Sequence, residues 1–139
     1  MENLFSVLKP SEILKLKLRF LYEKNGYTKY EMSRFEEYAF YLENRNFLIN
    51  DSVITFTDLD GRLLALKPDV TLSIAKNYQG GAQRVYYTEN VYRPDRAKRS
   101  FKEIEQMGLE CVGGIDSNAV SDVVVLAAQS MSLVSQESI

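Results

Sequence analysis

Two segments rich in β-forming residues lie between Arg84 and Gly114, and this pair constrains the fold more than any other feature. Only a polar, basic loop from Pro94 to Ser100 joins them. A loop of this length is too short for a parallel crossover, so the two strands must pair antiparallel. The chain should therefore contain a long β-hairpin, with its other segments arranged around it.

The second of these strands carries an unusual polar face. Because side chains alternate between the two faces of a strand, Gln106, Gly108 and Glu110 share one face. A glycine inside a strand weakens it unless something approaches closely at that point. We therefore expect a small polar ligand to lie over Gly108, between Gln106 and Glu110. The opposite face is the natural core face and carries Met107, Leu109 and Cys111.

Helix punctuation predicts helices over Ser11–Lys24 and Leu72–Asn77, and roughly over Ala119–Val134. Ser11 is the expected N-cap of the first helix, and Asp116 or Ser117 that of the last. Before Leu72, the segment Lys67-Pro68-Asp69-Val70-Thr71 has the composition of a helix start, so capping is the simplest role for Asp69 and Thr71.

Aromatic residues at helical spacing predict one more helical segment, Phe35–Tyr41, as core packing rather than a cofactor site. Short strands are expected over Tyr27–Met32, Val53–Thr57 and Leu63–Leu66, the last two joined by a turn at Asp60-Gly61. The predicted fold class is α+β, a mainly antiparallel sheet flanked by helices, in a single domain over residues 1–139.

Composition excludes several classes of function. The net charge of −2, from 17 basic and 19 acidic residues, gives no global attraction to nucleic acid or anionic membrane. No apolar run looks long enough for a membrane span, and the N-terminus lacks a secretion signal. A single cysteine indicates a reduced, cytoplasmic setting. The absence of histidine excludes a Ser-His-Asp triad, a Cys-His pair and a His-ligated zinc site in this chain.

Three segments in register resemble a known family. FTDLDGRLLALKPDVT, RVYYTENVYR and EIEQMGLECVGG are similar to the Leu-Arg-Pro-Glu-Gly-Thr segment, motif 2 strand and Gln-x-Gly-x-Glu strand of class II histidyl-tRNA synthetases. The similarity runs from about Leu14 to Val134. It implies the catalytic-core fold of class II aminoacyl-tRNA synthetases, in part.

The resemblance also implies roles for the matching residues. Asp69 and Thr71 stand where a synthetase holds the amino group of histidine, and Gln106 and Glu110 match further amino-acid-binding positions. Arg93 matches the motif 2 arginine, which holds the α-phosphate of ATP and the carboxylate. These roles agree with the chemistry, because an ammonium needs carboxylate and hydroxyl acceptors and a carboxylate needs a guanidinium fork.

The chain departs from the synthetase pattern at several positions. Ser33 stands in place of the motif 1 proline, and Asp69-Val70 replaces Glu-Gly. After Arg93, the usual x-Glu pair, which contacts adenine in synthetases, is Pro94-Asp95, a shorter acid behind a rigid residue. These features are more similar to the non-catalytic paralogue, the regulatory subunit of ATP phosphoribosyltransferase from bacteria with a short-form catalytic subunit.

That resemblance implies a partner and an effector. The partner would be the catalytic subunit of short-form ATP phosphoribosyltransferase in a hetero-oligomer, and histidine would be the feedback effector of the first step of histidine biosynthesis. A homodimer through the N-terminal helix region is also implied. We expect no catalytic residue, metal site or cofactor in this chain, and no membrane or nucleic-acid partner.

Two other interpretations stay open. Motif 3, the histidine-specific arginine segment and an anticodon-binding domain are absent, so we expect the N-terminal portion of a longer protein, and a synthetase fragment has the same features. Alternatively, the polar strand face is simply solvated. The basic loop Arg93–Lys102 separates none of these, because five basic residues in a polar loop are common on protein surfaces.

Overall fold

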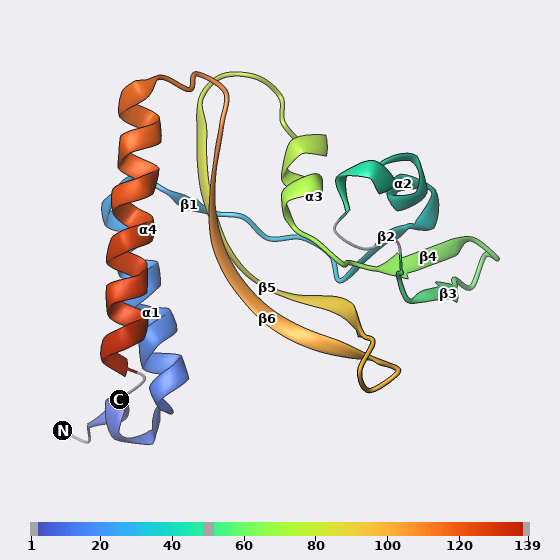
Figure 1. The fold of residues 1–139 in the computed structure, drawn as a ribbon, viewed down its shortest axis with the longest axis horizontal. Helices are drawn as coiled ribbons and strands as arrows, with labels where there is room; N and C mark the ends of the chain where they lie inside the picture. The colour runs from blue at the N-terminus through green and yellow to red at the C-terminus, as the bar shows by residue number, and fades with distance from the viewer. Residues whose placement is uncertain (1–2, 49–51, 138–139) are drawn as a thin grey trace. The chain divides into compact units, whose positions relative to one another are not determined.

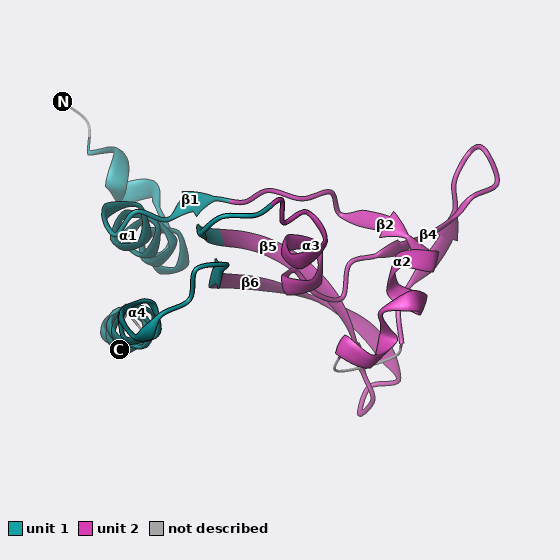
Figure 2. Ribbon diagram, turned by 90° about the horizontal axis from the view of Figure 1, so that it is seen from above, with its two compact units in different colours: residues 1–29, 80–86, 109–139 teal, residues 30–79, 87–108 magenta. Residues whose placement is uncertain are grey.

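A computed structural model describes residues 3–48 and 52–137 of the chain (Figure 1). The residues cluster into two compact units, each built from separate segments of sequence (Figure 2). Unit 1 contains residues 1–29, 80–86 and 109–139, and unit 2 contains residues 30–79 and 87–108. The fold class is α+β, as predicted, and the two strands of the long hairpin run through both units.

Unit 1 is built around two helices, α1 (Pro10–Lys24) and α4 (Ser117–Glu137), which pack against each other. The hydroxyls of Tyr22 and Ser130 form a hydrogen bond of 2.8 Å between them. The unit also contains a short 3₁₀ helix, η1 (Leu4–Val7), and strand β1 (Thr28–Lys29). Its buried apolar side chains are Leu18, Tyr22, Tyr27, Tyr86, Ala119 and Leu126.

Unit 2 contains a small antiparallel sheet with strand order β2-β4-β3. The strands are β2 (Phe35–Glu37), β3 (Thr55–Thr57) and β4 (Leu63–Leu66). Three short helices accompany them: α2 (Tyr38–Glu43), the 3₁₀ helix η2 (Arg45–Phe47) and α3 (Thr71–Lys76). The buried apolar side chains of the unit are Tyr41, Leu64, Ala65, Val70, Ile74, Tyr87 and Val91.

The predicted hairpin is formed by β5 (Gln83–Asp95) and β6 (Ser100–Val112). They belong to a sheet with order β1-β5-β6, in which β1 pairs parallel with β5. Burial differs from the prediction, because the expected core face of β6 is only half-buried while Tyr86, Tyr87 and Val91 of β5 are fully buried. β6 is an edge strand of the described sheet, so it has a neighbour on one side only.

Three sequence predictions need correction at the level of elements. Phe35–Glu37 is a strand rather than part of a helix, because it pairs with β4. The helix predicted to start at Ser11 starts at Pro10, and the Glu12 carboxylate accepts the Lys9 N–H at 2.7 Å. The polar tail expected from Ser135 is helical through Glu137, and residues 138–139 lie outside the described part of the chain.

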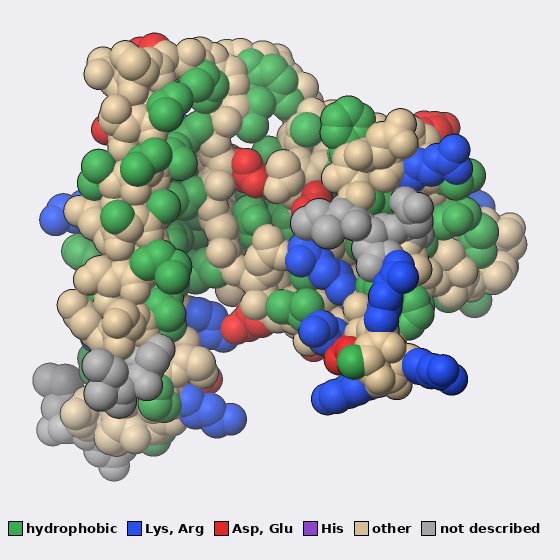
Figure 3. All heavy atoms as spheres, viewed as in Figure 1, with side chains coloured by type: hydrophobic (Ala, Val, Ile, Leu, Met, Phe, Trp, Pro, Cys, Tyr) green, Lys and Arg blue, Asp and Glu red, His purple; other side chains and the backbone are tan. Residues whose placement is uncertain are grey.

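Helix α4 is more apolar than the sequence analysis allowed. By length and composition its segment Ser117–Gln136 is long and apolar enough to cross a membrane. One such helix is weak support for a span, since helices of globular proteins reach the same values. Hydrophobic side chains line its visible face in Figure 3. The helix packs against α1, and its exposed apolar side chains include Val120, Val124, Val125 and Met131.

Candidate functional site

The segment Lys67–Asp69 lies against β5 in unit 2, and three contacts hold it there. The Tyr92 N–H donates to the Lys67 carbonyl at 2.9 Å, and Arg93 Nε donates to the Pro68 carbonyl at 3.1 Å. Lys67 Nζ lies 2.5 Å from Glu89 Oε2. The backbone that presents Asp69 is therefore fixed by the same strand that carries Arg93.

The Lys67–Glu89 ion pair is almost fully removed from water. The Lys67 side chain is 1% exposed and that of Glu89 14%. Glu89 also accepts the Met32 N–H at 3.2 Å, so the carboxylate has a second donor. Removing either partner would leave a buried charge uncompensated, which costs on the order of 3–5 kcal/mol. We conclude that Lys67 is a structural residue of this segment.

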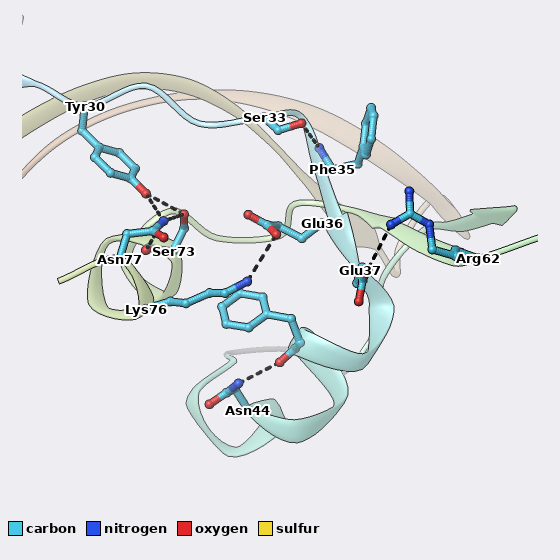
Figure 4. A network of polar contacts seen from close by, with 11 residues as sticks. Tyr30, Ser33, Phe35, Glu36, Glu37, Asn44, Arg62, Ser73, Lys76 and Asn77 are labelled. Carbon is cyan, nitrogen blue, oxygen red and sulfur yellow. Dashed lines mark hydrogen bonds and ion pairs between the residues drawn. The ribbon is translucent and has the colours of Figure 1, made fainter. Parts of the chain in front are cut away.

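Helix α3 begins at Thr71, directly after this segment, and is held at both ends. At its start, Asp69 Oδ2 accepts the Leu72 N–H at 2.9 Å, so Asp69, one residue before the N-cap Val70, provides an acceptor for an N–H of the first turn. Towards its end, Tyr30 makes hydrogen bonds with Ser73 and Asn77, at 2.7 and 2.9 Å (Figure 4). Side-chain bonds rather than helix length therefore fix this six-residue helix.

A second group of contacts links α3 with β2 and α2. Lys76 Nζ lies 3.6 Å from Glu36 Oε2 and 4.3 Å from the centre of the Phe40 ring (Figure 4). The Asn44 side chain donates to the Phe40 carbonyl at 2.8 Å. A cation over an aromatic face and beside a carboxylate is favourable on both counts. These contacts orient α3 within unit 2.

The start of α3 opens onto a cavity of about 580 Å³ within unit 2. Three of the predicted site residues line it: Asp69, Thr71 and Arg93. Its size suits an amino acid or a larger small molecule. The other lining residues are the aliphatic or aromatic Phe47, Leu48, Pro68, Leu72, Ala75, Pro94 and Ile104, together with Ser52 and Lys102. The cavity thus combines an apolar wall with one carboxylate, two hydroxyls and two cations.

Arg93 and Gln106 are in direct contact. Arg93 Nη2 donates to Gln106 Oε1 at 3.2 Å, in addition to the bond from Nε to Pro68. Because a guanidinium has five N–H donors, two protein acceptors leave donors for a carboxylate or phosphate. The structure therefore brings together Asp69, Thr71 and Arg93 at the cavity, with Gln106 beside Arg93.

Gly108 is closely approached, but by a side chain of the protein. A Cβ atom on Gly108 would lie 2.4 Å from the Tyr87 hydroxyl and 2.6 Å from its Cζ atom. Gln106 Nε2 donates to the same hydroxyl at 3.2 Å. The space over Gly108, which was predicted to hold a ligand, is thus occupied by the phenol of Tyr87.

Glu110 belongs to unit 1, whereas the other candidate residues belong to unit 2. It lies on β6 and is half-buried there. Close to it along the strand, the hydroxyl of Tyr27 lies 3.1 Å from Cys111 Sγ. Burial and this thiol contact raise the pKa of Tyr27, so the phenol stays neutral.

The tip of the β5–β6 hairpin is basic, as predicted (Figure 3). Arg99 has φ of 51°, the one described non-glycine residue with a positive value, which marks the tight turn. Nearby, a hydrogen bond to Glu103 and burial raise the pKa of Tyr92.

Within residues 3–48 and 52–137, no group of three or more Cys, Asp and Glu residues could hold a metal ion.

Two residues of this region were missed by the sequence analysis. Lys102 lines the cavity and Tyr87 contacts both Gln106 and Gly108. The signal for Tyr87 lies in the pairing of the two strands, because its ring lies against Gly108 of the neighbouring strand. An aromatic side chain facing a glycine on an edge strand is a known way of covering the exposed backbone.

Comparison with known proteins gives a family match over most of the chain. Residues 7–139 match the family described as histidyl-tRNA synthetase. An ATP phosphoribosyltransferase regulatory subunit from Clostridium novyi (strain NT) is 32% identical over 123 residues, which are 83% of this chain and 29% of that protein. A chloroplastic histidine–tRNA ligase from Gracilaria tenuistipitata var. liui is 35% identical over 89 residues, 59% of this chain and 21% of that protein.

Solved structures give the same fold. An ATP phosphoribosyltransferase regulatory subunit/histidyl-tRNA synthetase from Bacillus halodurans has a TM-score of 0.74 at 22% identity. The match covers 96% of this chain and 39% of that chain. An ATP phosphoribosyl transferase (HisG:HisZ) complex from Thermotoga maritima has a TM-score of 0.66 at 18% identity, covering 86% and 41%. The chain therefore spans less than a third of the curated relatives described above.

Proposed function

The chain belongs to the histidyl-tRNA synthetase family, and from this we propose that it is part of a histidine-sensing regulatory subunit of ATP phosphoribosyltransferase. The observation that carries the proposal is the cavity of unit 2, which Asp69, Thr71 and Arg93 line together. An α-amino acid has an ammonium and a carboxylate close together. Asp69 and Thr71 offer acceptors for the first and Arg93 offers donors for the second.

The regulatory role is supported by the similarity to the Clostridium novyi protein, which is called a regulatory subunit. This similarity extends over 83% of the chain. The Thermotoga maritima structure is a complex of two kinds of subunit, which supports a catalytic partner of the short form. Histidine would favour one arrangement of such a complex and so change activity at a distant site. A cytoplasmic location follows from this role in biosynthesis.

A histidyl-tRNA synthetase fragment is the second candidate. The Gracilaria ligase is 35% identical over its shorter match, and the cavity carries the cations Arg93 and Lys102, which suit a phosphate. Stabilising a transferring phosphoryl or adenylyl group requires several converging cations and usually Mg²⁺. The cavity has only two lining cations, Arg93 and Lys102, and the usual x-Glu adenine contact is the shorter acid Asp95 behind Pro94. Both features favour binding an amino acid without activating it.

The two candidates differ in measurable activity. The natural full-length protein should co-purify with a short-form ATP phosphoribosyltransferase catalytic subunit, and histidine should inhibit the complex. The same protein should show no histidine-dependent exchange of pyrophosphate into ATP. Robust exchange would overturn the regulatory assignment and support the synthetase.

The candidate histidine contacts can be tested in that complex. Gln106→Ala should weaken inhibition by histidine roughly 10- to 100-fold, because it removes a hydrogen-bonding partner from a charged ligand. Glu105→Ala is the matched control, since Glu105 lies on the opposite face of β6 from Gln106. Unchanged inhibition in Gln106→Ala would exclude this residue from the sensor.

A further inference from the structure

We propose that Tyr87 is a positioning residue that fixes the donor and acceptor orientation of the Gln106 side chain. The inference rests on the proposed histidine site, and it identifies Tyr87 as a residue on which that site depends. Tyr87 is 3% exposed, and of the three side chains in contact, Tyr87, Gln106 and Arg93, only Arg93 lines the cavity. Tyr87 would therefore act through Gln106 and Arg93 rather than on the ligand directly.

The orientation of Gln106 follows from the chemistry of its two neighbours. An arginine side chain can only donate hydrogen bonds, so the Gln106 oxygen must face Arg93. The amide nitrogen then faces Tyr87, whose hydroxyl oxygen accepts at 3.2 Å. Arg93 is fixed in turn by the Pro68 carbonyl, at 3.1 Å. The resulting chain of contacts runs from Tyr87 through Gln106 and Arg93 to the segment that presents Asp69.

Gly108 allows Tyr87 to take this position. A side chain at residue 108 would place Cβ 2.4 Å from the Tyr87 hydroxyl and 3.0 Å from its Cε1 atom. These distances are well below van der Waals contact, so the ring would have to move away. The glycine is thus explained by the tyrosine on the neighbouring strand, and its effect on a ligand would be indirect.

A fixed amide orientation matters for a ligand with two opposite charges. With its oxygen at Arg93 and its nitrogen at Tyr87, Gln106 keeps one acceptor lone pair and one N–H in defined directions. Without the Tyr87 hydroxyl, the amide nitrogen loses its partner and the side chain can take other rotamers. The ligand would then have to order the Gln106 side chain on binding, and the free-energy cost of this ordering would lower its affinity.

Histidine binding by the full-length protein tests the positioning role. Tyr87→Phe should weaken the binding of free L-histidine about 3- to 10-fold, the effect of one neutral hydrogen bond. In a Gln106→Ala background the same substitution should have no further effect on affinity, because the proposed influence of the Tyr87 hydroxyl on the ligand passes through Gln106. Additive losses would overturn the proposal, as would unchanged affinity in Tyr87→Phe.

Tyr86→Phe provides the matched control. Tyr86 is the neighbouring buried tyrosine of β5, and its hydroxyl donates to Glu23 at 2.5 Å, within unit 1. Its loss should lower stability and leave histidine affinity within about twofold, because it removes one hydrogen bond away from Gln106. An equal loss of affinity in Tyr86→Phe and Tyr87→Phe would mean that general destabilisation explains both.

A second measurement does not depend on histidine. In protein with ¹⁵N-labelled glutamine, the two side-chain amide protons of Gln106, identified by their absence in Gln106→Glu, should be well dispersed. They should move towards the values of free glutamine in Tyr87→Phe but not in Tyr86→Phe. Unchanged signals would overturn the inference. If the wild-type protein binds no histidine, the proposed function fails, and the amide signals still decide the role of Tyr87.

Discussion

Substitution can separate the observed contact of Asp69 at the start of α3 from its proposed contact with a ligand. One carboxylate oxygen accepts the Leu72 N–H at the start of α3, and the residue also lines the cavity. Asparagine caps helices as well as aspartate does but carries no charge. The helical contact should therefore survive Asp69→Asn, whereas attraction of a ligand ammonium should not.

We expect Asp69→Asn to change the free energy of unfolding by less than about 0.5 kcal/mol and to weaken histidine binding at least about tenfold. Asp69→Ala should lose the same affinity and, in addition, about 1 kcal/mol of stability. Denaturant titration and calorimetry measure the two quantities. Equal affinity of wild type and Asp69→Asn would rule out a charge contact from Asp69.

Tyr41 is the opposite case, a buried polar group without a partner. Its side chain is 2% exposed, and among the described residues nothing forms a hydrogen bond with its hydroxyl. Burial raises the pKa of Tyr41, so the folded state requires the neutral phenol. Since the folded pKa lies above the unfolded value of about 10, stability is fully present below pH 10 and falls as the pH rises above it.

Tyr41→Phe should therefore stabilise the protein by up to about 1 kcal/mol at pH 7 and reduce the loss of stability above about pH 10. Tyr30→Phe is the comparison, because the Tyr30 hydroxyl has partners in Ser73 and Asn77. It should lower stability by about 1 kcal/mol. Chemical denaturation at pH 7 and pH 10.5 measures both variants, and a destabilised Tyr41→Phe would contradict the prediction.

The positions of the candidate site residues were easier to anticipate than the side chains around them, while their role in binding histidine stays a prediction. Asp69, Thr71 and Arg93 lie at one cavity, as the resemblance implied, because they belong to motifs whose spacing is local. The close approach at Gly108 was also expected, but its occupant was not. Identifying Tyr87 required the register of two strands, which a reading of one strand at a time does not use.

At the level of elements, prediction succeeded where the determinants are local. The hairpin, α1 and α4 follow from β-forming residues, a proline and an aspartate near their ends. Phe35–Glu37 was assigned to a helix because Phe35, Tyr38 and Leu42 repeat at helical spacing. Pairing with β4 and an edge-on contact between the Phe35 and Phe56 rings, 5.4 Å apart, override that spacing.

Helix α4 provides a test of local capping. Asp116 Oδ1 accepts the Ala119 N–H at 2.8 Å, which selects Asp116 over Ser117 as the cap. Asp116→Ala should lower the free energy of unfolding by about 0.5–2 kcal/mol, because one N–H at the start of the helix loses its acceptor. Ser117→Ala should change it by less than about 0.5 kcal/mol. A larger effect of Ser117→Ala in denaturant titration would show that the capping assignment is wrong.

For the whole molecule, no pattern in the sequence indicates the two compact units. Length and composition indicate one domain. The two units are compatible with a single domain because strands β5 and β6 each have residues in both units. The division depends on which residues contact each other across long stretches of sequence. Segments 80–86 and 109–139 join the first 29 residues, a grouping that no local pattern encodes.

Self-association through the N-terminal helix, which the family resemblance implies, can be tested on α1. Phe20 is 70% exposed and Leu16 47%, and together with Leu133 they line a groove of about 390 Å³ in unit 1. Exposed apolar side chains gathered in a groove are typical of a contact surface. In a two-fold symmetric dimer each substitution acts twice, so its effect on association is doubled.

Phe20→Glu should therefore weaken dimerisation at least about tenfold, because burying one phenylalanine contributes about 1.5–3 kcal/mol. Leu59→Glu is the control, since Leu59 is fully exposed at the β3–β4 turn of unit 2 and outside this groove. Light scattering and sedimentation over a range of concentrations give the dissociation constants. If both variants dimerise like the wild type, the contact surface lies elsewhere. If Leu59→Glu alone weakens the dimer, the surface belongs to unit 2, and the α1 assignment is wrong.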